Sequence, residues 1–425
     1  MRAALRLAVT LGLVAFATRA EAIPAFARKY GMSCTACHLA WPILNQQGQA
    51  FRDAGYQFGT EKDEPTTVAP AYWPVAMRTT PAYQYTRTTN QESEAGPITI
   101  GSGGLPAGPA ADLLTAGTIA RDISFLLVAA GFAPPDEPAS LESAFVRLSN
   151  LGGSSWANFK IGKFEVDLPA SPHRGVSMTS GYAIYAPRQG SAVPLDLSAN
   201  QVGVEFDGHD AGSVTRYAIS LVSANDDPGG KGPWSSPLIY AHAQRSFETG
   251  SEVLPWVRLG LLGSIGWLPT TFQTLGGENI SGTGGDYKTY SRLGGEVTGQ
   301  IGNPASPLQW QVAYMYGQES AEVTPGEAKA TFSGGWLELD WVPVSRNDYN
   351  ATPYLVFARY DMVRQGAGPG DFDGLTLGVR RYLAVGPRAS AAVHLEVSSG
   401  TSKGTAYNGS NVQTTAAMAG IDFAF

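Results

Sequence analysis

The chain has 425 residues, of which 43% are hydrophobic, and its formal net charge is -7 at neutral pH. An acidic chain of this kind is not expected to bind nucleic acid. Charged residues make up only 15% of the sequence and glycine occurs 51 times, a composition typical of many strands separated by glycine-containing turns rather than of helices.

The first 22 residues have the features of a secretory signal peptide. Two arginines precede an apolar run from Leu7 to Thr18, and Ala20-Glu21-Ala22 forms a small-residue cleavage site. The apolar run is shorter than the roughly 20 residues that a membrane-spanning helix needs. We therefore expect residues 1–22 to be removed on export and the mature chain to begin at Ile23.

The motif Cys34-Thr35-Ala36-Cys37-His38 contains the only two cysteines of the chain. Two cysteines at this spacing, followed directly by a histidine, are typical of covalent attachment of a c-type haem. Each thiol can add to one vinyl group of the porphyrin, and the histidine can bind the iron from the proximal side. We therefore predict one covalent haem c, with Cys34 and Cys37 as attachment residues and His38 as the proximal iron ligand.

Three other interpretations of the two cysteines are weaker. A redox-active disulfide of this spacing prefers a βαβ context, which the surrounding sequence does not have. A closed zinc site needs about four ligands, and the chain has no second cysteine pair. A structural disulfide between residues so close in the chain would constrain very little of it.

Residues 23–60 are expected to form a small haem-bearing unit. Apolar residues at helical spacing after Pro42 predict a helix that begins there. Four aromatic side chains could cover a haem face or serve as ordinary core residues: Trp41, Phe51, Tyr56 and Phe58. The unit is too short to bury a haem alone, so we expect the rest of the chain to supply further walls. The polar, proline-rich residues 61–74 are predicted to be a linker.

Residues 75–425 show repeated alternation of apolar and polar residues. Val202, Val204 and Phe206, for example, alternate with Gly203, Glu205 and Asp207. A soluble sandwich and a membrane barrel both produce this pattern. Three features favour an outer-membrane β-barrel: strands of about 10–13 residues, connections of alternating length, and a last strand that ends on an aromatic residue.

The alternating segments predict about sixteen strands, an even number that puts both ends of the barrel on the periplasmic side. The expected strands lie near residues 75–89, 98–101, 118–131, 140–150, 155–165, 197–208, 212–224, 237–248, 253–267, 287–299, 308–319, 331–342, 351–363, 372–383, 388–399 and 412–425. Residues 144–164 resemble the matching hairpin of trimeric porins, after which a long loop folds into the pore. We expect the same of residues 166–196.

Residues 23–58, with the lead-in Ile23–Arg28 and the segment Gly31–His38, resemble the fused cytochrome–porin family of the outer membrane. Over the barrel the resemblance is architectural. The resemblance implies a small α-helical monohaem unit that plugs the barrel. It also implies a protein in the outer membrane of a Gram-negative bacterium, in contact with membrane lipid and with its N-terminus in the periplasm. It further implies electron transfer between an extracellular redox substrate, above all Fe(II), and a periplasmic c-type cytochrome or other soluble carrier. Such a protein is an Fe(II):cytochrome c oxidoreductase or an electron carrier.

Other functions remain open at this point. Electrons could run outward to an external acceptor, or the barrel could be a solute porin whose haem unit does not conduct. A soluble periplasmic cytochrome with a β-sandwich is a further alternative.

The sequence names no single second ligand for the iron. Met32 lies too close to Cys34 in the chain to reach across the porphyrin. The candidates are a methionine such as Met77 and the remaining histidines, His173, His209, His242 and His394, each of which is more simply a plain polar residue, and the site could also be open. Several acids of the expected outer loops could attract Fe(II) but are more simply solvated loop residues, so we name no iron ligands among them: Asp226, Asp227, Asp286, Asp371 and Asp373.

Overall fold

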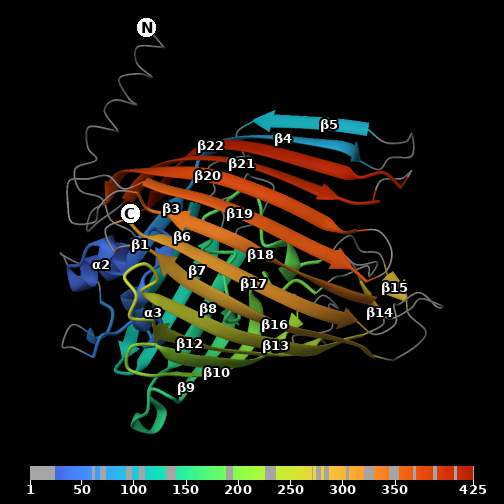
Figure 1. Ribbon diagram of the computed structural model, residues 1–425. Helices are drawn as coiled ribbons and strands as arrows, with labels where there is room; N and C mark the ends of the chain where they lie inside the picture. Colours follow the sequence, from blue (N-terminus) through green and yellow to red (C-terminus); the bar gives the residue numbers. More distant parts are fainter. Residues whose placement is uncertain are drawn as a thin grey trace.

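The computed structural model in Figure 1 is a closed antiparallel β-barrel whose N-terminal part forms a small unit at one mouth. It describes residues 24–59, 63–67, 73–91, 98–104, 111–130, 140–187, 195–224, 236–269, 271–273, 279–281, 287–302, 306–319, 330–343, 354–366, 370–385, 390–405 and 409–424. The expected signal peptide, residues 1–22, lies outside the described residues.

The N-terminal unit, which we call the plug, is built from short elements. These are the helix α2 (Pro24–Tyr30), the 3-10 turn η1 (Cys34–Ala36), the strands β1 (His38–Ala40) and β2 (Ile43–Leu44), and the helix α3 (Gln46–Asp53). No helix among the described residues is long and apolar enough to span a bilayer.

The barrel wall contains eighteen strand segments among the described residues. They are β3 (Val75–Thr79), β4 (Ala82–Gln91), β5 (Ile98–Gly104), β6 (Ala111–Ala120), β7 (Ile123–Ala130), β8 (Ser140–Leu148), β9 (Asn158–Phe164), β10 (Gln201–His209), β11 (Thr215–Ser223), β12 (Pro237–Glu248), β13 (Trp256–Pro269), β16 (Tyr287–Ile301), β17 (Leu308–Glu319), β18 (Ala330–Trp341), β19 (Tyr354–Gln365), β20 (Phe372–Val385), β21 (Ser390–Ser402) and β22 (Val412–Ala424). A separate hairpin of β14 (Thr271–Gln273) and β15 (Asn279–Ser281) lies between β13 and β16.

These segments occupy sixteen positions around the barrel. Both β3 and β4 pair with β22 on one side, so they form one interrupted barrel strand. On the other side β4 pairs with β5 and β3 pairs with β6, so β5 and β6 share the next position. The predicted barrel of about sixteen strands is confirmed.

The barrel wall turns apolar side chains outward and polar ones inward. Leu259 and Leu261 on β13 are 49% and 72% exposed, whereas Arg292 and Glu296 on the neighbouring β16 are each only 4% exposed. Lipid requires an apolar outer surface, which these side chains provide. It also requires that every backbone polar group be paired, and a closed barrel without edge strands satisfies this within its own wall. The protein is an outer-membrane β-barrel.

The connections define the orientation of the barrel. The turn between β6 and β7 has two residues and that between β10 and β11 has five, whereas 36 residues separate β9 from β10. Short turns face the periplasm in such barrels. The plug contacts this side, because Gln46 Nε2 donates to Gly212 O in the turn between β10 and β11 at 2.5 Å. The plug therefore lies at the periplasmic mouth, as Figure 1 shows for α2, α3 and β1.

In the long connection after β9, the described residues 165–187 and 195–200 fold into the lumen; we call them the inward loop. Ile184, Tyr185, Leu195 and Leu197 are fully buried in it. They pack in one apolar cluster with wall residues such as Trp336. The predicted inward-folding loop is confirmed.

Two predictions about local structure are wrong. The expected strand at residues 118–131 is a hairpin, because Asp122 adopts a left-handed conformation (φ 61°) that turns the chain between β6 and β7; aspartate tolerates this conformation better than most residues. The helix expected to begin at Pro42 begins at Gln46, since the side chain of Asn45 accepts a hydrogen bond from Gly48 N and caps it.

The described part of the expected linker packs against the plug and the wall. The carboxylate of Asp63 accepts hydrogen bonds from the hydroxyl of Tyr30 and from Phe58 N. Thr66 Oγ1 accepts from Thr118 N on β6 at 3.0 Å. Residues 63–66 therefore connect the plug to the barrel.

Candidate functional site

The three motif residues lie together at the inner surface of the plug. Cys34 is buried and Cys37 is half-buried, and the two are not joined in a disulfide. Asn45 holds the motif in shape, because its backbone N–H donates to Cys37 O at 3.0 Å and its side-chain amide donates to Ala36 O at 3.0 Å. The same residue caps α3, so the motif and the helix are fixed relative to each other.

Helix α3 approaches the motif through Gly48. A Cβ atom at this position would lie 2.1 Å from Cys37 O, far inside a normal van der Waals contact. Only glycine lets the helix backbone pack directly on the second cysteine of the motif. The sequence pattern alone did not reveal this requirement.

The backbone of the plug orients the imidazole of His38. Its Nδ1 lies 3.2 Å from Pro42 O. A carbonyl oxygen can only accept, so Nδ1 donates in this contact, as it does in many metal-binding histidines. Burial lowers the pKa of His38 to about 4, so the ring is neutral at physiological pH.

Aromatic side chains cover the inner surface of the plug. Phe26 and Phe51 lie edge to face at 5.1 Å between ring centroids, Phe26 stacks on Tyr56 at 4.9 Å, and Phe51 lies 4.5 Å from Phe58. Of the four predicted aromatic residues, Trp41 is the one that packs elsewhere, with its ring 5.4 Å from the guanidinium of Arg380 on β20. The other three form the core of the plug.

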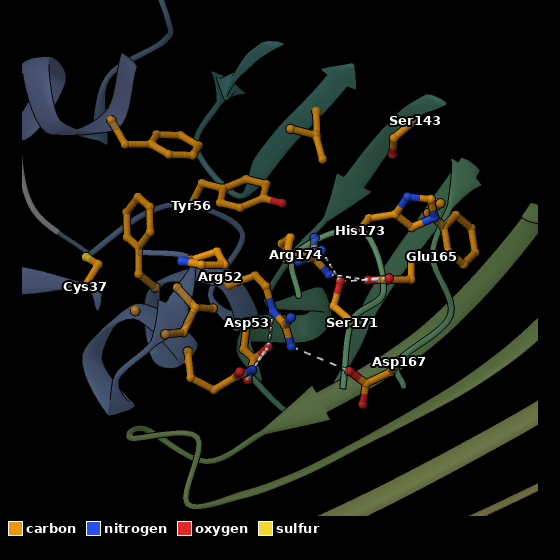
Figure 2. Close-up of a pocket in the computed structure, with 18 of the residues that line it drawn as sticks. Cys37, Arg52, Asp53, Tyr56, Ser143, Glu165, Asp167, Ser171, His173 and Arg174 are labelled. Carbon is orange, nitrogen blue, oxygen red and sulfur yellow. Dashed lines mark hydrogen bonds and ion pairs between the residues drawn. The ribbon is translucent and has the colours of Figure 1, made fainter. Parts of the chain in front are cut away.

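The three motif residues and the aromatic side chains of the plug line one cavity of about 340 Å³ between the plug, the inward loop and the barrel wall. The wall contributes apolar side chains such as Met77, Leu126 and Phe145, and the inward loop contributes His173 and Arg174. In Figure 2, Cys37 lies at one end of this space and His173 at the other. The cavity thus has walls from the barrel and the inward loop as well as from the plug.

The residues present fit a covalently attached haem. The two thiols and the imidazole of His38 share the cavity with aromatic and aliphatic side chains. His173 Nε2 is buried there without a hydrogen-bond partner among the described residues. A buried polar atom of this kind is commonly satisfied by a ligand or water. The haem itself stays a prediction from the motif.

Three of the candidates for a second iron ligand line this cavity. They are Met77 on β3, His173 in the inward loop and His209 on β10, and Met32 of the plug lines it too. His394 is fully buried on β21, with its Nε2 3.0 Å from Glu396, and neither it nor His242 on β12 lines the cavity.

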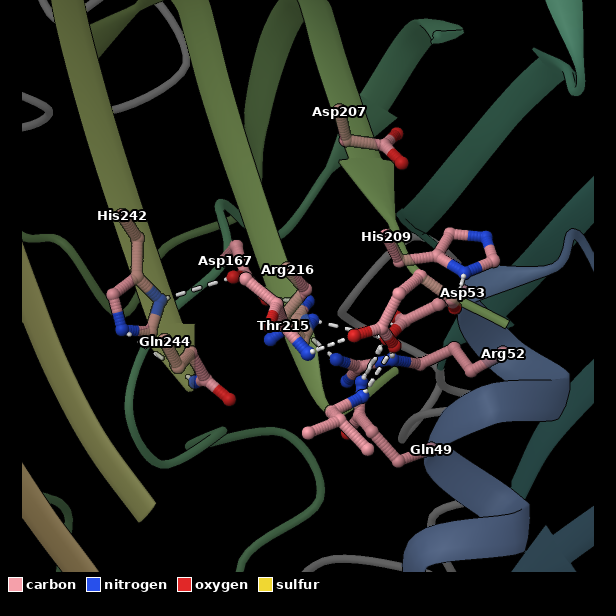
Figure 3. A network of polar contacts seen from close by, with 12 residues as sticks. Gln49, Arg52, Asp53, Asp167, Asp207, His209, Thr215, Arg216, His242 and Gln244 are labelled. Atoms are coloured by element: carbon pink, nitrogen blue, oxygen red, sulfur yellow. Dashed lines mark hydrogen bonds and ion pairs between the residues drawn. The ribbon is translucent and has the colours of Figure 1, made fainter. Parts of the chain in front are cut away.

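A network of charged side chains connects the plug, the wall and the inward loop (Figure 3). Arg216 on β11 binds Asp53 of α3 at 3.0 Å and Asp167 of the inward loop at 2.6 Å. On its other side Asp167 lies 3.0 Å from Nδ1 of His242 on β12. Sequence analysis did not predict this network, because its members are far apart in the chain and follow no motif.

The two carboxylates of the network have lowered pKa values. Burial alone would raise the pKa of Asp53, but the charges of Arg216 and Arg52 outweigh it. Burial would raise the pKa of Asp167 as well. The charge of Arg216 is the largest of the contributions that outweigh it, and the pKa of Asp167 falls well below its usual range. Both carboxylates are therefore ionised at physiological pH, and their charge contributes to the seating of the plug.

We expect the seating of the plug to weaken as the pH falls below about 4, the ordinary pKa of aspartate. A carboxylate whose pKa is lower in the folded than in the unfolded state stabilises the fold above the unfolded pKa and loses this effect as the pH falls through the folded one. Hydrogen-exchange protection of α3, corrected for intrinsic exchange, should drop in this window. Asp53→Asn should lower protection already at pH 7, whereas Glu252→Gln, at an exposed position in the turn between β12 and β13, should not. Unchanged protection down to pH 3 would contradict this.

The acids of the expected outer loops give no iron site among the described residues. Asp371 accepts a hydrogen bond from Gln365 N at 2.8 Å, and Asp373 binds Arg364 and Lys403 at 2.5 and 2.8 Å. The expectation that they are ordinary loop acids agrees with these contacts. The other three, Asp226, Asp227 and Asp286, lie outside the described residues.

Comparison with known proteins identifies a fold and no family. No protein-family model matches the chain, and no curated protein matches it.

Among solved structures, an anion-selective porin from Comamonas acidovorans is similar with a TM-score of 0.52 and 10% identity, over 83% of this chain and 99% of that one. A loop-deletion mutant of the outer membrane protein OmpT of Vibrio cholerae has a TM-score of 0.46 and 13% identity, over 83% and 100% of the two chains. OmpF of Salmonella typhi has a TM-score of 0.47 and 10% identity, over 83% and 97%. The similarity to the Comamonas acidovorans porin agrees with the closed antiparallel barrel of this chain. The chain has the fold of an outer-membrane porin, and the cytochrome part of the resemblance stays a prediction.

Proposed function

We propose that this protein transfers electrons across the outer membrane between an extracellular redox substrate and a periplasmic carrier, with a c-type haem attached to Cys34 and Cys37 in its plug. The observation that carries the proposal is that Cys34, Cys37 and His38 lie together in one cavity that aromatic and aliphatic side chains line. A haem held there would supply a one-electron carrier. Fe(II) is the external donor that the family resemblance favours.

The residues around the motif suit this role. The plug lies in the periplasmic mouth, where a soluble c-type cytochrome can approach it. The neutral ring of His38 is oriented by Pro42 and by the fixed position of α3. Aromatic and aliphatic side chains line the cavity, and an apolar, enclosed site limits the access of water and sets the redox potential.

The packing of the inward loop favours electron transfer over passage of solutes. An apolar cluster joins the loop to the wall, and in it Tyr185 of the inward loop and Trp336 of the wall lie 5.2 Å apart between ring centroids. The polar edges of the inward loop are bound to the wall as well. Arg292 donates to Tyr185 O at 2.7 Å, and Arg359 donates to Gly181 O at 2.9 Å. A lumen packed in this way favours a closed barrel for hydrophilic solutes.

A solute porin with a non-conducting haem unit is the second candidate. The barrel fold that the chain shares with an anion-selective porin favours it, since sixteen-stranded porins commonly enclose an aqueous channel. Outward electron flow to an external acceptor is compatible with the same site, because the direction depends on the reduction potentials of the partners.

The proposal is tested by adding Fe(II) anaerobically to the purified, oxidised protein in detergent while the haem absorption is recorded. We expect rapid reduction whose rate saturates with the Fe(II) concentration. The control is the Cys37→Ala variant, which should show no saturable response. A haem that dithionite reduces and Fe(II) does not would contradict Fe(II) as the donor, and absence of covalent haem would contradict the proposal as a whole.

A further inference from the structure

We propose that Arg52 of the plug and Arg174 of the inward loop bind the two carboxylate groups of a porphyrin attached at Cys34 and Cys37. This inference rests on the function proposed above and adds to it two residues that hold the cofactor. It makes the haem the connection between the plug and the inward loop.

The chemistry of the porphyrin determines where its carboxylates lie. The vinyl groups that react with the cysteines are on one edge of the ring, and the two propionates are on the opposite edge. Figure 2 shows Cys37 at one end of the cavity, with Arg52 and Arg174 both displaced from it toward the interior. Both arginines line the same cavity as the motif. A ring attached at the motif and extending into the cavity therefore directs its propionates toward them.

The two guanidinium groups have donors to spare. Arg52 makes ion pairs with Asp53 at 3.6 Å and with Asp167 at 3.5 Å, and both separations are longer than a hydrogen bond. Arg174 binds Glu165 through Nη2 alone, and its side chain is 42% exposed within the described residues. A guanidinium has five N–H donors in a planar fork that matches a carboxylate.

The other cationic residues of the cavity are already engaged. Arg78 binds Asp112 through both Nε and Nη2. Arg147 donates to Asp207, to Asp53 O and to Ser149. These contacts satisfy their guanidinium groups against the wall and the plug, so they are less suited to receive a ligand than Arg52 and Arg174.

Arg216 and Lys160 are engaged in the same way. Arg216 bridges Asp53 and Asp167 at 3.0 and 2.6 Å, and Lys160 is bound to Glu205. Arg258 lines the cavity as well, and its Nε and Nη2 donate to Ser246 and Gln46 at 3.0 Å each. Unlike these residues, Arg52 and Arg174 combine access to the cavity with few or long contacts of their guanidinium groups.

An arginine at a propionate affects the haem in two measurable ways. A nearby positive charge disfavours the ferric form, so its removal should lower the midpoint potential. An arginine also keeps a propionate ionised at neutral pH. Without it the propionate should titrate near neutral pH, and the midpoint potential should become dependent on pH there.

The test is spectroelectrochemical titration of the full-length protein carrying Arg174→Gln or Arg52→Gln. At a fixed applied potential we expect the ratio of ferric to ferrous haem to rise about tenfold, the effect of one charge near 10 Å at an effective dielectric constant of about 20. We further expect a pH-dependent midpoint potential between about pH 5 and 8, and partial recovery of both properties in Arg174→Lys. The matched control is Arg121→Gln, because Arg121 is exposed in the turn between β6 and β7 and is 95% accessible as a side chain.

The possible outcomes separate this inference from the function on which it rests. Covalent haem in both variants with shifted, pH-dependent potentials would support the role of the two arginines. Covalent haem with potentials equal to those of the wild type and of Arg121→Gln would overturn it and leave the proposed function intact. Absence of covalent haem from the wild-type protein would overturn both. Arg174 lies outside the plug, so its variant remains informative even if Arg52→Gln weakens the seating of the plug.

Discussion

Replacing Cys37 by alanine is expected to abolish stable covalent haem and to leave the barrel folded. The backbone carbonyl of Cys37 accepts a hydrogen bond from Asn45 N, the cap of α3. The substitution changes only the side chain and leaves this hydrogen bond in place. The barrel is held by continuous strand pairing around its circumference. Haem staining of the denatured protein should therefore fall to background, while heat-modifiable migration on gels should persist.

The matched control for this variant is Met32→Leu, which changes another cavity-lining side chain and conserves its volume approximately. It should retain covalent haem. Haem staining of Cys37→Ala at wild-type intensity would contradict attachment at the motif. Loss of the barrel in the same variant would show instead that haem attachment is required for folding of the whole chain.

Replacing residues 168–197 by a short Gly-Ser linker is expected to open the lumen. This segment supplies the buried Ile184, Tyr185 and Leu195, and it crosses a barrel of sixteen positions, a size that otherwise leaves an aqueous channel. Polar wall residues such as Arg359 and Glu396, now bound to the loop, would become hydrated. Conductance in planar lipid bilayers should rise by about tenfold or more over the wild type.

The matched control is removal of the β14–β15 hairpin, Thr271–Ser281, which forms its own small sheet outside the barrel ladder. This deletion should leave the low conductance unchanged. A wild-type protein that conducts as well as the loop variant would contradict the closed lumen and would favour the solute porin.

The barrel could be predicted from the sequence because its pattern is local and repeated. Alternation such as that of Leu375, Leu377 and Val379 reflects two different faces of a strand, here an outer face in lipid and an inner face in the lumen. The hairpin at Asp122 was missed, because Ala120-Arg121-Asp122 contains neither glycine nor proline, the usual signals of a turn. A left-handed aspartate is visible only in the structure.

The candidate site could be predicted only in part. The motif residues are adjacent in sequence, so Cys34, Cys37 and His38 were identified directly. Arg174 could not be, because its proximity to the motif depends on how the inward loop crosses the lumen. The Asp53–Arg216 pair depends on docking of the plug in the same way. Contacts between residues far apart in the chain carry no local signal in one sequence.

The central claim is that electrons, and not hydrophilic solutes, cross this barrel. The most direct measurement uses vesicles that contain the protein and enclose an oxidised c-type cytochrome, with Fe(II) added outside under anaerobic conditions. We predict reduction of the enclosed cytochrome by vesicles with the wild-type protein and none with Cys37→Ala, while a small hydrophilic dye enclosed alongside it is retained. Escape of the dye without reduction of the enclosed cytochrome would contradict this account and would identify the protein as a solute channel.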